Sequence, residues 1–203
     1  MPFEYAVALT GGIATGKSTT TMLLSLYGFR FIDADKIAHS MLDTHSNKIA
    51  QLFGDEFVAD GRVDRTKLGN LIFSDSSKRV ELESLLHPLI YQEIERLSIE
   101  QDRYQKPYII DIPLFFEGGR YPIERSVVIY TPKDKQLERL VARDGYTQDE
   151  ALKRIESQMD IEEKRRRATF VIDNSGDLKQ LQRECDRVKE EILSSFEATQ
   201  GDR

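Results

Sequence analysis

A phosphate-binding loop motif near the start of the chain constrains this sequence more than any other feature. Residues 11–18 read G-G-I-A-T-G-K-S and match the pattern G-x-x-x-x-G-K-[ST] at every defined position. The apolar run 5–10 before the motif is typical of a buried strand, and residues 18–27 have a helical pattern that ends at Gly28. A strand, a loop and a helix in this order form the context in which the motif binds phosphates. The sequence therefore predicts a nucleotide-binding α/β protein.

Each defined residue of the motif has a chemical reason. Gly11 and Gly16 let the loop wrap tightly, so that backbone N–H groups point at one phosphate chain. Lys17 would add a cation at the β and γ phosphates, Ser18 a hydroxyl to Mg²⁺, and the helix its positive N-terminal end. The alternative interpretation is a glycine turn before a surface helix, and the strand–loop–helix context argues against it.

Composition limits the remaining possibilities. The chain has 203 residues, 39% of them hydrophobic, which suffices for one core with inserted segments. A net charge of −6 provides no overall positive field for nucleic acid. Cys185 is the only cysteine, which excludes an internal disulfide and is typical of a reducing compartment. With no signal-peptide pattern and no apolar run approaching about 18 residues, we expect a cytoplasmic enzyme without a membrane partner.

Five apolar, strand-like runs alternate with helical segments. The runs are residues 5–9, 29–32, 108–112, 127–130 and 170–172. Near-continuous apolar strands separated by helices indicate a parallel sheet that is covered on both faces. We therefore predict an α/β fold in three layers, built as one domain.

Two segments interrupt this alternation. Residues 36–105 carry apolar side chains at helical spacing and are predicted to form a helical insertion that is long enough for a substrate pocket. Residues 133–167 begin with two basic helices joined at Asp144 and Gly145, the second opened by a capping box at Thr147. This segment is predicted to be a lid over phosphates, although a solvated charged face gives the same pattern. The core is then formed by residues 1–35, 106–132 and 168–196.

Polar residues follow the strands where ligands bind in an open parallel sheet, at the carboxyl ends. Asp33 ends the second run, and a carboxylate there can take or orient the proton of an attacking hydroxyl. Asp33 and Asp35 could instead cap the next helix, and Asp35, just before the helical run, is then the better cap. Asp111 follows an apolar run as a Walker-B acid does and can help to hold Mg²⁺ through water.

Other positions leave alternatives open. Asn174 to Gly176 could offer amide and backbone groups to a purine edge, or form the turn before the last helix. That helix, 177–196, has a core-facing stripe that includes Cys185 as a buried residue, and residues 198–203 are expected to be a tail. His87 precedes Pro88, which favours a first helical turn, so this pair is predicted to enter a helix.

These pieces, in this order, resemble the dephospho-coenzyme A kinase family. The matching segments are residues 9–13, 16–19, 32–35, 86–90, 113–117, 139–144, 150–158 and 171–176. The family phosphorylates the ribose 3′-hydroxyl of dephospho-CoA in the last step of coenzyme A synthesis. The resemblance implies a P-loop kinase core of five parallel strands, a helical substrate domain and a lid. It also implies ATP and Mg²⁺ as cofactors, and a monomer or weak homo-oligomer.

The resemblance assigns roles to individual residues. It implies Asp33 as the base for the 3′-hydroxyl, with Lys17 and Arg143 as further catalytic residues. The implied ATP-binding residues are Gly12, Ile13, Ala14, Thr15, Gly16, Lys17, Ser18, Thr19, Arg139, Asn174 and Gly176. The implied substrate-binding residues are Asp33, His87, Pro113 and Leu114, and the implied Mg²⁺ ligands are Ser18 and Asp111.

The sequence departs from the family pattern in the loop. The family usually reads G-G-I-G-S-G-K, whereas this chain has Ala14 and Thr15 at the fourth and fifth positions. If the residue at position 14 requires a positive φ, alanine costs about 1 kcal/mol relative to glycine. We expect weaker ATP binding from this change, without its abolition.

Rival functions share the loop. One is another small-molecule kinase, acting on a nucleoside monophosphate or a sugar, and another is a nucleotide-dependent switch without an acceptor. A GTPase is disfavoured, because the only Asn-Lys pair, at Asn47, lacks the acid of the guanine motif. A nucleic-acid-binding module is disfavoured as well, since residues 164–167 form a lone basic cluster on an acidic chain.

Overall fold

The core of the protein is a five-stranded sheet with helices on both faces. The computed structural model describes residues 2–201. The strands are β1 (Ala6–Gly11), β2 (Phe31–Asp33), β5 (Tyr108–Asp111), β6 (Arg125–Tyr130) and β7 (Phe170–Asp173). Their order is β2-β5-β1-β6-β7, and β1 pairs in parallel with β5 and β6. The predicted α/β fold with a five-stranded parallel sheet is confirmed.

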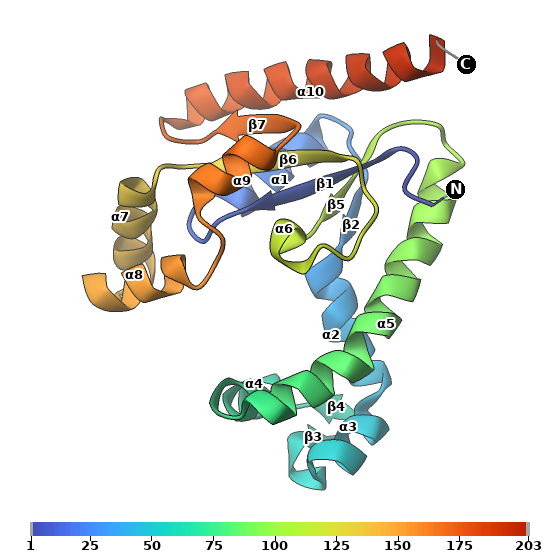
Figure 1. Cartoon of the computed structure of the whole chain (residues 1–203), viewed down its shortest axis with the longest axis vertical. Coiled ribbons are helices and arrows are strands. Elements are labelled where there is room, and N and C mark those ends of the chain that lie inside the picture. Colours follow the sequence, from blue (N-terminus) through green and yellow to red (C-terminus); the bar gives the residue numbers. More distant parts are fainter. Residues whose placement is uncertain (1, 202–203) are drawn as a thin grey trace. The chain divides into compact units, whose positions relative to one another are not determined.

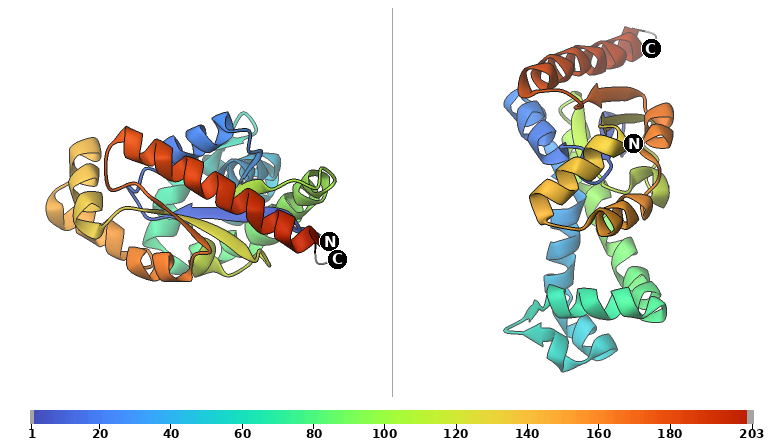
Figure 2. Two further views of the ribbon diagram at one scale, coloured as in Figure 1. Left: turned by 90° about the horizontal axis from the view of Figure 1, so that it is seen from above. Right: turned by 90° about the vertical axis from the view of Figure 1, so that its left-hand side faces the viewer.

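Helices cover the sheet on both sides, which explains the apolar strands. Helices α1 (Lys17–Leu26) and α10 (Leu178–Gly201) lie on one face, whereas α6 (Phe115–Gly118) and α9 (Ile161–Arg167) lie on the other (Figures 1 and 2). Every residue of β1 and of β5 is buried. Since β1 lies at the centre of the sheet, the loop that follows it emerges in the middle of the carboxyl edge, where ligands bind in such sheets.

The chain divides into two compact units. The first comprises the chain up to Ile32 together with the chain from Ser98 onward, and the second comprises Asp33–Leu97. The second unit contains α2 (Ala34–Thr44), α3 (Ser46–Phe53), the short helix η1 (Asp55–Phe57), β3 (Val58–Ala59), β4 (Arg62–Val63), α4 (Arg65–Ser74) and most of α5 (Ser76–Asp102). It has its own apolar core of Ile49, Val63, Leu68, Leu82 and Leu86.

The second unit is not wholly helical. Strands β3 and β4 form an antiparallel hairpin whose turn is Asp60-Gly61, with φ values of 51° and 74°. Positive φ at both central residues is the geometry for which Asp-Gly is the usual turn sequence. The helical spacing of the apolar residues in this segment did not predict these two short strands.

The two helices of the predicted lid segment are confirmed. They are α7 (Lys133–Asp144) and α8 (Gln148–Glu156). Gly145 ends α7 in a left-handed conformation, with φ 70°. The capping box is also present: the Thr147 hydroxyl accepts from the Glu150 N–H, and the Glu150 carboxylate accepts from the Thr147 N–H. Both helices lie beyond the carboxyl ends of the strands (Figure 1).

Two predictions about helix ends are wrong. His87 and Pro88 do not enter a helix but lie inside α5, which continues through Pro88 although proline removes one backbone donor. The tail predicted for residues 198–203 is helical as far as Gly201, because α10 extends that far, and residues 202 and 203 lie outside the described residues.

The core-facing stripe of the last helix is confirmed from Leu181 onward, whereas Leu178, which the helical spacing also placed in it, is exposed. Cys185 is fully buried in it, and this burial raises the pKa of its thiol to about 11. Cys185 therefore behaves as a small apolar residue. Within residues 2–201, no helix combines the length and the apolar character that a membrane crossing needs.

Candidate active site

The loop between β1 and α1 is tightly wound. Ala14 has φ 59° and Gly16 has φ 87°, both in the left-handed region. The carbonyl oxygen of Gly12 accepts from the Thr15 N–H at 3.3 Å and from the Thr15 hydroxyl at 2.9 Å. Position 14 thus has the positive φ on which the expected cost of alanine depends, and alanine there carries a strain of about 1 kcal/mol.

A cluster of polar residues, Thr131, Arg139 and Asn174, supports the loop through hydrogen bonds. The Asn174 side-chain amide donates to the Thr15 carbonyl oxygen at 2.8 Å, and the Thr131 hydroxyl lies 3.2 Å from the same oxygen. Arg139 donates to the Asn174 carbonyl oxygen at 2.8 Å and to the Thr131 hydroxyl at 3.2 Å. The cluster thus connects helix α7 and the residues that follow β6 and β7 to the loop at Thr15. Sequence reasoning missed Thr131, because a threonine after a strand carries no local signal of this contact.

The packing of Asn174 makes Gly16 a sensitive position, and we expect Gly16→Ala to destabilise the protein far more than Gly28→Ala. Both glycines have positive φ, 87° and 94°, so alanine costs roughly 1–2 kcal/mol at either. A Cβ at Gly16 would lie 2.0 Å from Asn174 Nδ2, whereas a Cβ at Gly28 would meet no described atom within 4 Å. Overpacking of this kind adds roughly 1–3 kcal/mol.

Urea unfolding of the two variants measures this difference. We expect a loss of about 3 kcal/mol in the free energy of unfolding for Gly16→Ala and of about 1 kcal/mol for Gly28→Ala. Gly28→Ala is the matched control, since it changes the backbone preference without the clash. Equal losses in the two variants would contradict the packing of Asn174 against the loop.

A buried lysine holds the start of the loop. Lys164, fully buried in α9, donates to the Gly11 carbonyl oxygen at 3.0 Å and pairs with Glu117 at 2.8 Å. Its neighbours also have partners within the protein: Arg165 lies over the Tyr130 ring, and Arg166 pairs with Glu163 at 2.6 Å. The cluster at residues 164–167 is therefore not a patch of unpaired cations, and Lys164 is a structural residue that sequence reasoning missed.

Lys17 and Asp111 form the ion pair of the site. Lys17 Nζ lies 2.7 Å from both carboxylate oxygens of Asp111, and the two side chains are 25% and 11% exposed. Asp111 ends β5, next to β1, so the two predicted residues come together because their strands are neighbours. Ser18 lies in the first turn of α1, beside Lys17.

A cavity of about 730 Å³ lies over the loop. It is lined by Gly11 to Thr19, Pro113, Arg139, Ala142, Arg143, Gln158 and Asn174. The structure thus brings together the predicted loop residues, both lid arginines, Pro113 and Asn174. Pro113 is fixed by the Thr10 hydroxyl, which donates to its carbonyl oxygen at 2.8 Å.

The two lid arginines differ in their surroundings. Arg139 donates hydrogen bonds to Thr131 and Asn174, the two residues that contact the Thr15 carbonyl. Arg143 lies near the end of α7, with its side chain 62% exposed, and binds Asp144 at 2.7 Å. The hydrogen bond to Asp144 raises the pKa of the Arg143 guanidinium and lowers that of the Asp144 carboxyl. Arg143 therefore keeps its charge and has a side chain that can reach solvent.

Several predicted site residues lie elsewhere. Leu114 is half exposed just before α6, and the Gly176 N–H donates to Gln180 at 3.2 Å in the turn before α10. Asp33 and His87 belong to the second unit, where His87 lies in α5.

Asp33, not Asp35, caps the helix that follows β2. Its carboxylate accepts from the Lys36 N–H at 2.9 Å and lies 3.1 Å from Lys36 Nζ. Asp35 is the second residue of α2, within its first turn, so the prediction that it is the better cap is wrong. The helix begins two residues earlier than its apolar pattern suggests, because Ala34 already has a helical conformation.

Comparisons with known proteins agree with one another. The sequence model of one family, described as dephospho-CoA kinase, matches residues 5–180. A protein named dephospho-CoA kinase from Sulfurimonas denitrificans is 60% identical over 97% of this chain and 98% of that protein. A protein of the same name from Helicobacter hepaticus is 50% identical over 88% of each chain. The solved structure of dephospho-CoA kinase from Campylobacter jejuni has a TM-score of 0.71 and 33% identity, and the match covers 94% of this chain and 98% of that one.

Proposed function

The chain belongs to the dephospho-CoA kinase family, and from this premise we propose which of its residues carry out the family's reaction. The enzyme phosphorylates dephospho-CoA with ATP, which is the final step of coenzyme A biosynthesis. One observation carries the assignment of the site: a cavity of about 730 Å³ joins the phosphate loop to Pro113, Asn174 and the two lid arginines.

The phosphates of ATP are assigned to the loop. Backbone N–H groups at the N-terminal end of α1 offer donors and a positive partial charge, whereas the Ile13 N–H donates to Gln158 and the Thr15 N–H to Gly12. Lys17 adds a full charge, and its position is set by Asp111 at 2.7 Å. Asn174 has two roles in this proposal. Its side chain supports Thr15, as observed, and the segment from Asn174 to Gly176 borders adenine.

Ser18 and Asp111 suit Mg²⁺, because magnesium prefers oxygen ligands and is usually held by one or two carboxylates together with substrate phosphates. A hydroxyl and a carboxylate provide such a donor set. In the described residues, no group of three or more His, Cys, Asp and Glu side chains comes together as a metal site. We propose that Ser18 and Asp111 hold the ion together with ATP, and that the bound ion neutralises charge on the phosphates.

The acceptor is assigned to Asp33, with His87, Pro113 and Leu114 as further binding residues. Asp33 is the last residue of β2, and ligands of parallel sheets bind at this end of the strands. Its carboxylate accepts the proton of the ribose 3′-hydroxyl or orients that hydroxyl for in-line attack. Positioning and charge stabilisation provide most of the rate in phosphoryl transfer, so a weak base suffices.

Arg143 is assigned to the transferred phosphoryl group, whereas Arg139 maintains the loop. We expect Arg143→Ala to lower kcat on the order of 100-fold, because one charged donor to the transition state is lost. Arg154→Ala is the matched control: Arg154 lies on α8 with its guanidinium over the Tyr146 ring, and it is not among the residues that line the cavity of the described chain. Steady-state kinetics measure both variants, and equal effects would contradict the assignment.

The proposed acceptor is tested by ADP release from ATP and Mg²⁺ with dephospho-CoA, beside adenosine, AMP and shikimate. We expect release above the acceptor-free rate with dephospho-CoA alone. Release with another acceptor only would remove the substrate assignment and leave the fold as found. The predictions of a cytoplasmic enzyme that is a monomer or weak homo-oligomer remain proposals.

A further inference from the structure

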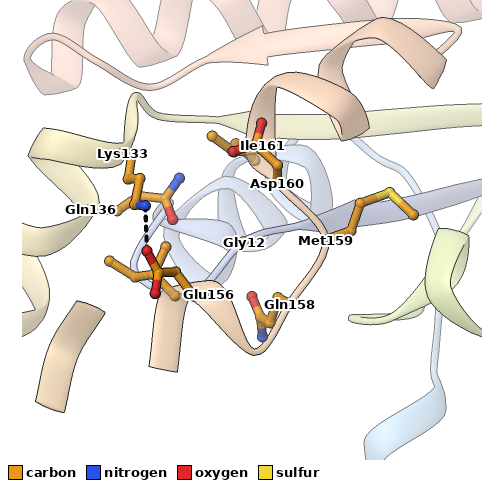
Figure 3. Close-up of a pocket in the computed structure, with 9 residues that line it drawn as sticks. Gly12, Lys133, Gln136, Glu156, Gln158, Met159, Asp160 and Ile161 are labelled. Atoms are coloured by element: carbon orange, nitrogen blue, oxygen red, sulfur yellow. Dashed lines mark hydrogen bonds and ion pairs between the residues drawn. The ribbon is translucent and has the colours of Figure 1, made fainter. Parts of the chain in front are cut away.

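One backbone donor of the phosphate loop is held by a distant side chain. The Ile13 N–H donates to Gln158 Oε1 at 2.8 Å, across 145 residues of sequence. Gln158 lies in the link between α8 and α9, and Figure 3 shows it beside the loop segment that contains Gly12. It also lines the large cavity over the loop. Gln158 therefore connects the link that follows the lid helices to the loop.

The link that carries Gln158 is fixed on both sides. The Gln158 N–H donates to the Ile155 carbonyl oxygen at 3.2 Å, and the Met159 N–H donates to Glu117 at 3.0 Å. Glu117 in turn pairs with Lys164, which holds the Gly11 carbonyl oxygen. Residues 158–164 therefore contact the loop on both sides of Gly12, at the Gly11 carbonyl and at the Ile13 N–H.

Packing alone does not place Gln158. A cavity of about 160 Å³ lies between Gly12, the lid helices and the link, and Gln158 is one of its lining residues (Figure 3). Lys133 and Glu156 form an ion pair of 2.9 Å between α7 and α8 at this cavity. This cavity leaves open space beside Gln158, and the hydrogen bond to Ile13 restrains the amide of its side chain.

The bond matters because of the residue that follows Ile13. Ala14 is held at φ 59°, and a non-glycine residue keeps such a conformation only where its surroundings fix it. Gln158 fixes the Gly12–Ile13 peptide, one residue before Ala14, through the Ile13 N–H, and Asn174 fixes the Thr15–Gly16 peptide, one residue after Ala14, through the Thr15 carbonyl. The Thr131 hydroxyl also donates to the Thr15 carbonyl, so loss of the Gln158 contact weakens the support of the turn mainly on its Ile13 side.

We propose that Gln158 is a positioning residue, whose Oε1 holds the Ile13 N–H and so keeps the loop in its phosphate-binding shape. The inference rests on the proposed function, in which this loop binds the phosphates of ATP. Gln158 acts through the loop and not on the acceptor, so its loss raises KM for ATP and leaves kcat nearly unchanged. Through this hydrogen bond, Gln158 also makes the shape of the loop depend on residues 157–160, which link α8 to α9.

The test uses Gln158→Met, which keeps the length of the side chain but removes the acceptor. Amide hydrogen exchange at Ile13 should accelerate about tenfold, and KM for ATP should rise about tenfold, with kcat within about twofold and the melting temperature unchanged. Adding Ala14→Gly should restore most of the ATP affinity, because glycine adopts the left-handed conformation without strain. Ser157→Ala is the control, since the exposed Ser157 hydroxyl bonds only to Arg154 within the described residues.

The exchange and kinetic measurements distinguish a positioning role of Gln158 from other effects of its replacement. Faster exchange at Ile13 with an unchanged KM for ATP would overturn the proposal, and so would a fall in kcat equal to the rise in KM. If Gln158→Met does not fold, Gln158→Asn, whose amide is one carbon too short to reach Ile13, is judged by the same readouts. Failure of the wild-type protein to bind ATP would instead reject the proposed function, while exchange at Ile13 would still report on the bond.

Discussion

Replacing Lys17 with methionine should lower kcat/KM on the order of 10³-fold, one of the two largest effects that we expect from a single side chain. Methionine keeps the length and most of the apolar stem of lysine but removes its charge. In the proposed mechanism, that charge stabilises negative charge on the β and γ phosphates, which increases in the transition state. We therefore expect kcat to fall together with ATP affinity.

The Lys17 variant needs a control, because the lysine also pairs with Asp111 at 2.7 Å. Removal of the cation takes away an ion-pair partner of a carboxylate that is only 11% exposed, so part of the effect could reflect a less stable site. Lys179→Met makes the same change at an exposed position of α10 and should leave kinetics unchanged. Circular dichroism of both variants at assay temperature shows whether they are folded. A folded Lys17→Met enzyme with nearly normal kcat/KM would reject the phosphate site.

Replacing Asp33 with asparagine should lower kcat on the order of 10³-fold and leave KM for ATP nearly unchanged. Asparagine is almost isosteric with aspartate but cannot accept a proton, so it tests the carboxylate itself. The substitution is also well suited to the local structure. Asp33 caps α2 through the Lys36 N–H, and asparagine is as good an N-cap as aspartate. The free energy of unfolding should therefore change little.

The control for Asp33 is Asp35→Asn, which removes the same charge from an exposed position two residues further along α2. It should reduce kcat no more than about twofold, since long-range charge effects on an exposed helix are weak. Kinetics at varied ATP and varied dephospho-CoA measure the two variants side by side. If Asp33→Asn weakens ATP binding as much as it slows turnover, the carboxylate belongs to the nucleotide site and is not the base.

The sequence predicted those parts of the protein that have local signatures. The loop motif, the apolar strands and the capping box at Thr147 each depend on residues that are close in the chain. The positive φ at Ala14 was also predictable, because the family pattern has a glycine at that position. Asp111 came next to Lys17 because β5 and β1 are neighbours in the sheet, as the Walker-B interpretation of its strand implies.

The contacts that hold the loop could not be predicted in this way. Gln158, Lys164 and Asn174 reach the loop across 145, 153 and 159 residues of sequence. Each is a common surface residue type, and its burial or pairing depends on how distant segments pack. Lys164 in particular lies in a run of four basic residues, which is typical of a solvated face, and only the packing of α9 on β6 shows that it is buried.

The most direct test of the central claim is to determine where the phosphoryl group is added. The wild-type enzyme is incubated with ATP, Mg²⁺ and dephospho-CoA, and the product is analysed by mass spectrometry and by phosphorus–proton correlation NMR. The account predicts one added phosphate, coupled to the proton on carbon 3 of the ribose, and no such product from the Lys17→Met enzyme. A phosphate on another oxygen, or product formation that is independent of Lys17, would contradict it.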